Sequence, residues 1–122
     1  MKYHAEVTGW GEDALEFLSE DMNFIVIFNE NAPAELREIS ILHTITQLGE
    51  DPAPGDTLIL GDKVFDITAV GEEAKHTLRT LGHCTFNFNG GSEAERPGMI
   101  MVKGDEPFTP EDVKEGMLIE IV

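Results

Sequence analysis

The chain has 122 residues, a length typical of one domain, and 41% of them are hydrophobic, which suffices for a core without disulfides or a structural metal. Its 8 Lys and Arg residues stand against 24 Asp and Glu residues, which gives a formal net charge of −16. Because so acidic a protein is repelled by a phosphate backbone, non-specific binding to nucleic acid is excluded. We expect one globular domain over residues 1–122 and no nucleic-acid partner.

The apolar runs and the cysteine content bear on cellular location. The longest uninterrupted apolar run, Phe24 to Phe28, is far shorter than the roughly 18 to 20 residues that cross a bilayer. The first residues show neither the apolar stretch of a secretory signal nor an Arg-rich transit pattern. Cys84 is the only cysteine, so the chain gives no sign of an oxidising compartment. We expect a cytoplasmic protein with no membrane insertion.

Short apolar or alternating runs, bounded by Gly, Pro, Asn and Asp, recur along the chain and favour strands over helices. The runs cover residues 3–7, 22–28, 39–48, 57–60, 64–70, 83–88, 99–103 and 117–122. Gly61-Asp62-Lys63 lies between two of them and predicts a tight hairpin loop. Eight candidate strands in a chain of this length predict a mainly β fold, a small closed or partly closed β-barrel.

Two stretches depart from the strand pattern. Residues 72–81 place apolar side chains at helical spacing, begin with acidic residues and precede Gly82, which suits a left-handed C-cap. They predict one short helix. Residues 13–20 also have apolar residues one turn apart, but they are too few for more than one or two helical turns.

The four histidines differ in their surroundings. His4 alternates with apolar residues in a predicted strand and His76 lies within the predicted helix, so both are interpreted as surface residues. His43 instead shares a strand face with Ile41 and Ile45. It is either a core histidine whose ring is satisfied by a backbone carbonyl, or a sheltered imidazole that acts as a nucleophile or base.

His83 directly follows the predicted helix cap, at the start of a strand. With Thr85 and Asn87 it forms the polar face of that strand, which either lines a pocket or meets water. Cys84 lies on the opposite, apolar face, and is interpreted as a small buried hydrophobe rather than as a nucleophile.

A basic group stands out in this acidic chain, because four of its twelve Lys, Arg and His residues fall within residues 75–83. Lys75 and Arg79 are four apart and so are neighbours on one helix face. Either Glu72 and Glu73 neutralise them, or they form an anion site, for instance for a phosphoryl group.

The sequence lacks the common cofactor and metal motifs. The loop over residues 89–98 contains glycines but no nucleotide-binding pattern, and no HExxH, GxSxG or EF-hand pattern occurs. Arg96 in this loop is either a partner contact or an exposed arginine without a special role. We expect no cofactor and no metal site.

Several motifs, taken in order, are similar to those of one family. They are Ala32-Pro33-Ala34-Glu35-Leu36, the strand around His43, Thr68-Ala69-Val70-Gly71, Leu78-Arg79-Thr80-Leu81-Gly82-His83, and Glu93-Ala94-Glu95 followed by Pro97-Gly98. Together they resemble the glucitol/sorbitol-specific IIA component of the bacterial phosphoenolpyruvate-dependent sugar phosphotransferase system, over nearly the whole chain.

The resemblance implies a cytoplasmic phosphoryl carrier with a β-barrel-like fold. Such a carrier is phosphorylated on one histidine by the phosphocarrier protein HPr and passes the group to the IIB domain of the IIB/IIC membrane permease, which phosphorylates the incoming sugar alcohol. His43 matches the phosphorylated position. His83 and Arg79 match further motif positions and are assigned supporting roles. Some members have a second histidine where this chain has Ile45, so a second imidazole would come from His83.

Two alternatives remain at this stage. In a non-catalytic small-ligand or regulatory binding barrel, His43 is a core residue, and burial of both its ring nitrogens would favour that interpretation. A metal-dependent enzyme that uses His43, His83 and carboxylates has no spacing signature behind it.

Overall fold

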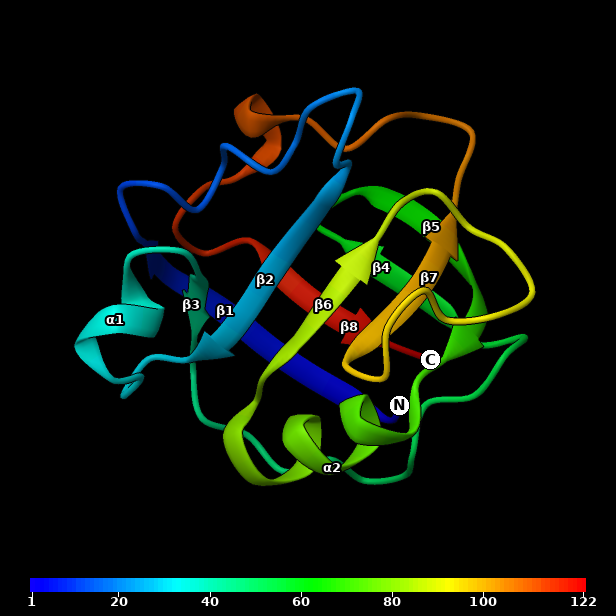
Figure 1. Cartoon of the computed structure of the whole chain (residues 1–122). Helices are drawn as coiled ribbons and strands as arrows, with labels where there is room; N and C mark the ends of the chain where they lie inside the picture. The colour runs from blue at the N-terminus through cyan, green and yellow to red at the C-terminus, as the bar shows by residue number, and fades with distance from the viewer.

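The computed structural model describes all of residues 1–122, and its eight strands close into a barrel (Figure 1). Around the barrel the strand order is β1-β3-β2-β6-β7-β5-β4-β8. The strands are β1 Tyr3–Trp10, β2 Phe24–Asn29, β3 Ile41–His43, β4 Thr57–Leu60, β5 Lys63–Val70, β6 Cys84–Asn87, β7 Met99–Lys103 and β8 Leu118–Ile121. The predicted mainly β fold is confirmed, and the barrel is closed.

The helical parts are few. The predicted helix is present as α2, Glu72–Leu81, with the expected bounds. A single turn, α1 Ala34–Arg37, and a 3-10 turn over Pro110–Asp112 complete the set. No helix combines the length and the apolar character that crossing a bilayer requires.

Most neighbouring strands are antiparallel, but the pairs β2–β3 and β6–β7 are parallel. Two parallel neighbours must be joined by a crossover connection that brings the chain back to the start of the next strand. Helix α1 lies in the crossover between β2 and β3. The β4–β5 hairpin turns through Gly61 and Asp62, since Leu60 pairs with Lys63. Gly61 has φ 65°, which glycine adopts without strain, so the predicted tight hairpin is confirmed.

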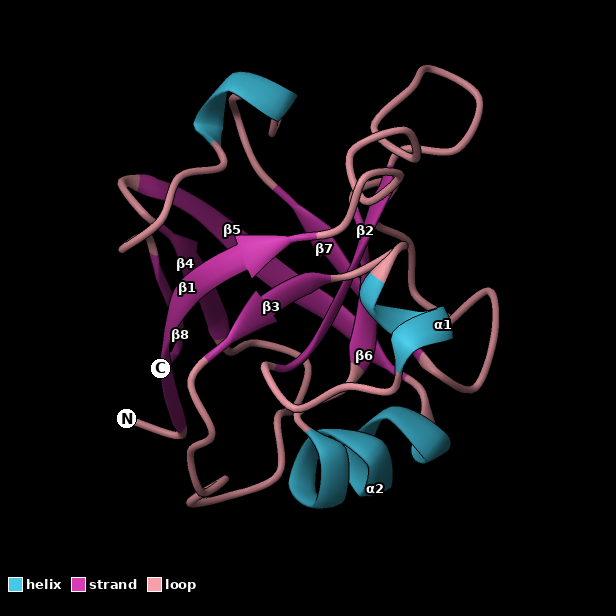
Figure 2. Ribbon diagram, turned by 90° about the vertical axis from the view of Figure 1, so that its left-hand side faces the viewer, coloured by secondary structure: helices cyan, strands magenta, loops and turns pink.

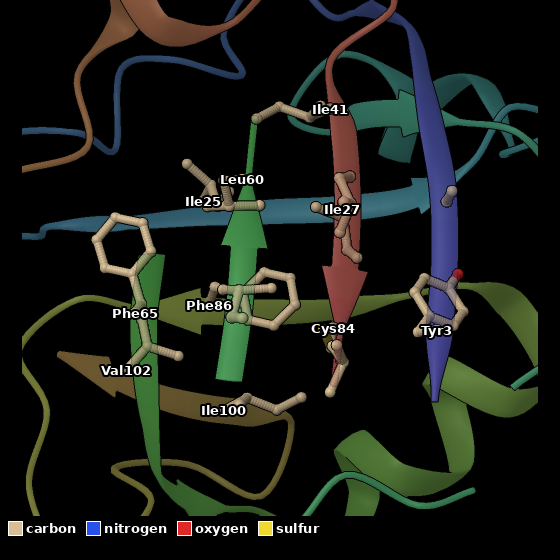
Figure 3. Close-up of a cluster of buried hydrophobic side chains, with 14 of the residues drawn as sticks. Tyr3, Ile25, Ile27, Ile41, Leu60, Phe65, Cys84, Phe86, Ile100 and Val102 are labelled. Atoms are coloured by element: carbon tan, nitrogen blue, oxygen red, sulfur yellow. The ribbon is translucent and has the colours of Figure 1, made fainter. Parts of the chain in front are cut away.

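The barrel interior is filled by the inward side chains of the alternating strands. In β1, Tyr3, Ala5 and Val7 are buried while the residues between them are exposed, as a period of two requires. Figure 3 shows side chains from opposite walls, among them Tyr3, Ile27, Phe86 and Ile100, meeting in this core. The burial of His4's neighbours and the exposure of His4 confirm its interpretation as a surface strand residue.

Strand β2 is apolar from Phe24 to Phe28, which suits its burial on both faces of the barrel wall. Its inward residues join the main core, whereas Phe28 packs outside the barrel with Ala32 and Leu42. Leu36 of α1 lies against this outer cluster. The single turn of α1 therefore covers the outside of the barrel wall next to β3.

Helix α2 covers one end of the barrel (Figures 1 and 2). Ala74 and Leu78 point into the core from it. The helix ends at Gly82, whose φ is 62° and whose N–H donates to the carbonyl of Leu78, and the next N–H, of His83, donates to Thr77. With Gly82 in the left-handed region, the bond from its N–H to Leu78 forms a C-terminal cap of the αL kind, which fixes the Gly82 backbone at the barrel end.

Two predicted elements differ from the structure. The run over residues 39–48 predicts one long strand, but β3 ends at His43 and residues 44–56 form a loop. The barrel end is reached there, so Ile45 is 59% exposed instead of sharing an apolar face with His43. Residues 13–20 form turns rather than a helix, because so short a segment does not repay helix nucleation.

Candidate functional site

His43 is the last residue of β3, at the barrel end that α2 covers. Its inward side chain has no exposed surface. Nδ1 lies 2.9 Å from the carbonyl oxygen of Thr44, and Nε2 lies 2.8 Å from the carbonyl oxygen of Gly82. Both ring nitrogens are therefore buried against backbone acceptors, which by itself favours the core histidine of the binding-barrel interpretation.

A neutral imidazole has only one N–H, so it cannot donate to both carbonyls. Burial lowers the pKa of His43, and the carbonyls of Thr44 and Gly82 and the charge of Glu30 offset this only in part. The ring is therefore neutral near pH 7. One nitrogen donates, and the other turns its lone pair towards a carbonyl oxygen, a repulsive contact.

The two covering carbonyls belong to different segments. Gly82 is held by the α2 cap. Thr44 begins the loop after β3 and is held to β1, because its N–H donates to the carbonyl of Glu6 and its Oγ1 accepts from the Glu6 N–H. A reagent reaches His43 only after one of these segments, or the ring itself, has moved.

Other polar atoms at this barrel end lack partners. Tyr3 packs edge-on against His43 with ring centroids 6.0 Å apart, and its buried hydroxyl has no hydrogen-bond partner. Asn29 ends β2 and pairs in register with His43, and its Oδ1 is also buried without a partner. A buried group without a partner is uncommon in a native structure and calls for an explanation.

His83 lies on the other side of the β2 wall. It is half-buried and packs against Phe28, a residue of the outer cluster, with ring centroids 4.7 Å apart. Its Nδ1 lies 3.1 Å from the carbonyl oxygen of Ile27 and donates to it, whereas its Nε2 forms no hydrogen bond within the protein. No hydrogen bond joins the His83 ring to the His43 ring, and the two are linked through the backbone at Gly82.

Lys75 and Arg79 of α2 both form ion pairs with acidic residues. Only Lys75 pairs with an acidic residue of the first helical turn, as expected. Lys75 pairs with Glu72 at 3.1 Å. Arg79 forms an ion pair with Asp51, which lies in the loop after β3, and both side chains are about half exposed. This ion pair joins the two segments whose carbonyls cover His43.

The remaining candidates offer no reactive group. Cys84 is fully buried, and burial raises the pKa of its thiol, so it is an inert core residue as predicted. His4 lies 2.9 Å from Glu120 on the surface. No three His, Cys, Asp or Glu side chains converge in a way that would hold a metal ion.

Comparison with known proteins agrees with this architecture. The family model of the PTS system glucitol/sorbitol-specific IIA component matches residues 2–120. The chain belongs to this family. It is therefore a phosphotransferase-system IIA component, which favours a phosphotransferase over the binding-barrel and metal-enzyme interpretations.

Curated relatives of this IIA component support the assignment. The PTS system glucitol/sorbitol-specific EIIA component of Escherichia coli K12 is 36% identical over 118 residues, covering 97% of this chain and 92% of the relative. The corresponding component of Shigella flexneri has the same identity and coverage. The crystal structure of a PTS system IIA component from Enterococcus faecalis V583 shares the fold, with a TM-score of 0.76, 22% identity, and coverage of 98% of this chain and 99% of that chain.

The sequence does not identify Asn29, Tyr3 or Gly82 as neighbours of His43. The sequence marks Gly82 as a helix cap and as part of a family motif, and Tyr3 as a strand residue, whereas Asn29 lies one residue beyond the predicted strand of residues 22–28. One sequence signal could have identified Asn29. It follows Ile25 and Ile27 at the strand period of two, so it is a polar residue on the face that points into the core.

Proposed function

We propose that this IIA component accepts a phosphoryl group from phospho-HPr on His43 and passes it to the IIB domain of a sugar-alcohol permease. The observation that carries the proposal is the match to the IIA family over residues 2–120, together with the position of His43 at the motif residue that the resemblance assigns to phosphorylation. The neutral His43 ring lies between two carbonyl oxygens. One lone pair is already held in an unfavourable contact, and transfer to phosphorus relieves it. Family membership supports the direction of this chemistry.

The transfer step needs little from the protein beyond alignment and stabilisation of the phosphoryl oxygens. The free nitrogen of His43 attacks phosphorus in line, an N–P bond forms, and the donor leaves with the electron pair of its broken bond to phosphorus. The other ring nitrogen keeps its proton, so the phosphorylated ring gains positive charge. The carbonyl that still accepts this N–H stabilises the charge, and onward transfer reverses the step.

His83 and Arg79 take supporting roles in this proposal. His83 donates to Ile27 and packs against Phe28, and it thereby holds the Gly82 carbonyl against His43. Arg79 exchanges its ion pair with Asp51 for the phosphoryl group when the cover over His43 opens. An arginine suits this exchange because its guanidinium recognises carboxylate and phosphate oxygens alike.

Partner recognition follows from charge. A net charge of −16 steers a partner with a basic face and raises the association rate more than the affinity, which suits a carrier that must release each partner. The component would work on the cytoplasmic side of the membrane. The names of its curated relatives support glucitol, also called sorbitol, as the sugar alcohol of the permease.

The test is phosphorylation in a reconstituted system. Purified protein is incubated with phosphoenolpyruvate, enzyme I and HPr, and its intact mass is recorded beside His43→Ala and His83→Ala. Wild type and His83→Ala should gain one acid-labile phosphoryl group, and His43→Ala none. Discharge on addition of the IIB domain completes the test. If wild type gains nothing from a matched HPr, the non-catalytic binding barrel becomes the better interpretation.

A further inference from the structure

The carboxamide of Asn29 is a buried polar group without a role in the proposed transfer step. Asn29 is only 8% exposed, and its Oδ1 is fully buried without a hydrogen-bond partner. No side-chain hydrogen bond of Asn29 is formed at either end of the carboxamide, although the residue lies at the end of a well-paired strand. An orphaned polar group in this position points to a partner that arrives during the reaction cycle.

The carboxamide lies beside the His43 ring. The two residues pair in register across β2 and β3. A Cβ placed on Gly82 would lie 2.0 Å from Asn29 Oδ1 and 2.8 Å from His43 Cε1, so both side chains approach the same point. Cε1 is bonded to both ring nitrogens, so a group attached to either nitrogen is close to the Asn29 carboxamide.

We propose that Asn29 is a phosphoryl-binding residue, whose carboxamide donates through Nδ2 to an oxygen of the phosphoryl group on His43. The proposal rests on His43 being the acceptor. Rotation of the carboxamide by about 180° would place the Nδ2 donors where the unpaired Oδ1 lies in the structure. This rotation costs little, because the terminal side-chain torsion of asparagine has no sharp preference.

A neutral donor suits a group that must be both accepted and released. In the closed state no basic side chain lies inside the barrel end beside His43, because Arg79 is half-exposed and stays paired with Asp51 until the cover opens. A buried cation would hold the dianion too firmly, whereas an amide donor already in position stabilises charge as it develops and adds none of its own.

The discriminating variant is Asn29→Leu, which removes both polar atoms and nearly conserves the shape. Because it removes an unsatisfied buried acceptor, unfolding in urea should show a midpoint equal to or above that of wild type. The initial rate of phosphorylation by phospho-HPr should nevertheless fall on the order of 10- to 100-fold, the effect of losing one hydrogen bond to a charged group. Asn29→Asp, which places a carboxylate beside the phosphoryl group, should be slower still.

Asn87→Leu is the matched control. Asn87 is a buried asparagine at the far end of β6, and its Oδ1 accepts from the N–H of Asn89 at 2.9 Å. Its replacement should lower the urea midpoint and leave the phosphorylation rate of the folded protein unchanged. The opposite patterns of the two leucine variants separate a role in phosphoryl binding from a role in packing.

Direct evidence comes from the side-chain amide of Asn29 in ¹H–¹⁵N spectra. Phosphorylation should shift its Nδ2 protons downfield, as a new bond to a phosphoryl oxygen requires. If wild type carries the group on His43 while Asn29→Leu reacts at the wild-type rate, and the amide signal does not move, this proposal is overturned and the acceptor assignment stands. If wild type is not phosphorylated on His43, the proposed function itself fails.

Discussion

The imidazole of His43 and the carbonyl oxygen of Gly82 meet at 2.8 Å, which joins the ring to the last turn of α2. The same glycine lies so close to His43 and Asn29 that no side chain fits there. Its φ of 62° is in the left-handed region as well. The helix cap also covers the His43 ring, and Gly82 serves both roles.

We expect Gly82→Ala to cost more stability than the left-handed conformation alone explains. That conformation costs about 1–2 kcal/mol in a residue with a Cβ. In Gly82→Ala the added Cβ must also displace the Asn29 carboxamide. Gly116→Ala is the control, since Gly116 has φ 88° and open space around it. Urea denaturation should show the larger loss at Gly82, and equal losses in the two variants would contradict this account of the site.

The stability of the protein should depend on pH through His43. Burial lowers the pKa of this ring below its ordinary 6.5, so the unfolded chain takes up a proton before the native protein does. As the pH falls from 7 to 5, the free energy of unfolding should therefore decrease, by up to about 1.4 kcal/mol per pH unit. His43→Gln should lack this component. A difference between wild type and variant that is constant with pH would show that burial does not disfavour protonation.

The ion pair of Arg79 with Asp51 should restrain phosphorylation. Asp51→Asn loosens the tie between α2 and the loop after β3 and frees Arg79, so we expect a severalfold faster reaction with phospho-HPr. Arg79→Ala should react more slowly. Both changes should alter stability by less than about 1 kcal/mol, because the pair is half exposed.

Lys75→Ala is the control for charge in that comparison. It removes one positive charge from the same helix, where Lys75 pairs only with Glu72. Its phosphorylation rate should match that of wild type. If Arg79→Ala also leaves phosphorylation and onward transfer unchanged, Arg79 has no part in the reaction.

Acid should weaken the barrel at Asp112. Burial alone would raise the pKa of this carboxyl group, but hydrogen bonds from Lys63 Nζ at 2.7 Å and the Thr109 N–H at 2.8 Å lower it below the ordinary 3.8. The stabilisation is therefore complete well above pH 3.8 and is lost as the pH falls through the lower, native value. The stability difference between wild type and Asp112→Asn should shrink from pH 6 to pH 3. A difference that persists at pH 3 would exclude this contribution.

Helix α2 could be predicted to the residue because its signals are local. Acidic residues in the first turn and a glycine at the cap act within a few positions, and the structure uses both. The end of β3 could not be predicted in this way. Residues 44–48 continue an apolar pattern, but a strand lasts only as long as its neighbours pair with it, and the partners of β3 are fixed by the closure of the barrel.

In the candidate site too, features with local sequence signals could be predicted, and features that depend on long-range packing could not. His43 was found because a histidine on an apolar strand face is uncommon and because its position matches a family motif. Its contact with Gly82 spans 39 positions in sequence and depends on how α2 packs on the barrel end. Asn29 reaches the ring through the parallel pairing of β2 with β3, a register that no local pattern reveals.

The most direct test of the central claim is to observe the phosphorylated ring itself. Protein labelled with ¹⁵N in its histidines is phosphorylated by phospho-HPr, and long-range ¹H–¹⁵N spectra are recorded with and without ³¹P decoupling. We expect coupling to phosphorus at one ring nitrogen of His43, with the other nitrogen protonated, and no coupling to phosphorus in the His83 ring. Coupling in the His83 ring, whose Nε2 is already free, would contradict the assignment of His43 as the phosphoryl carrier.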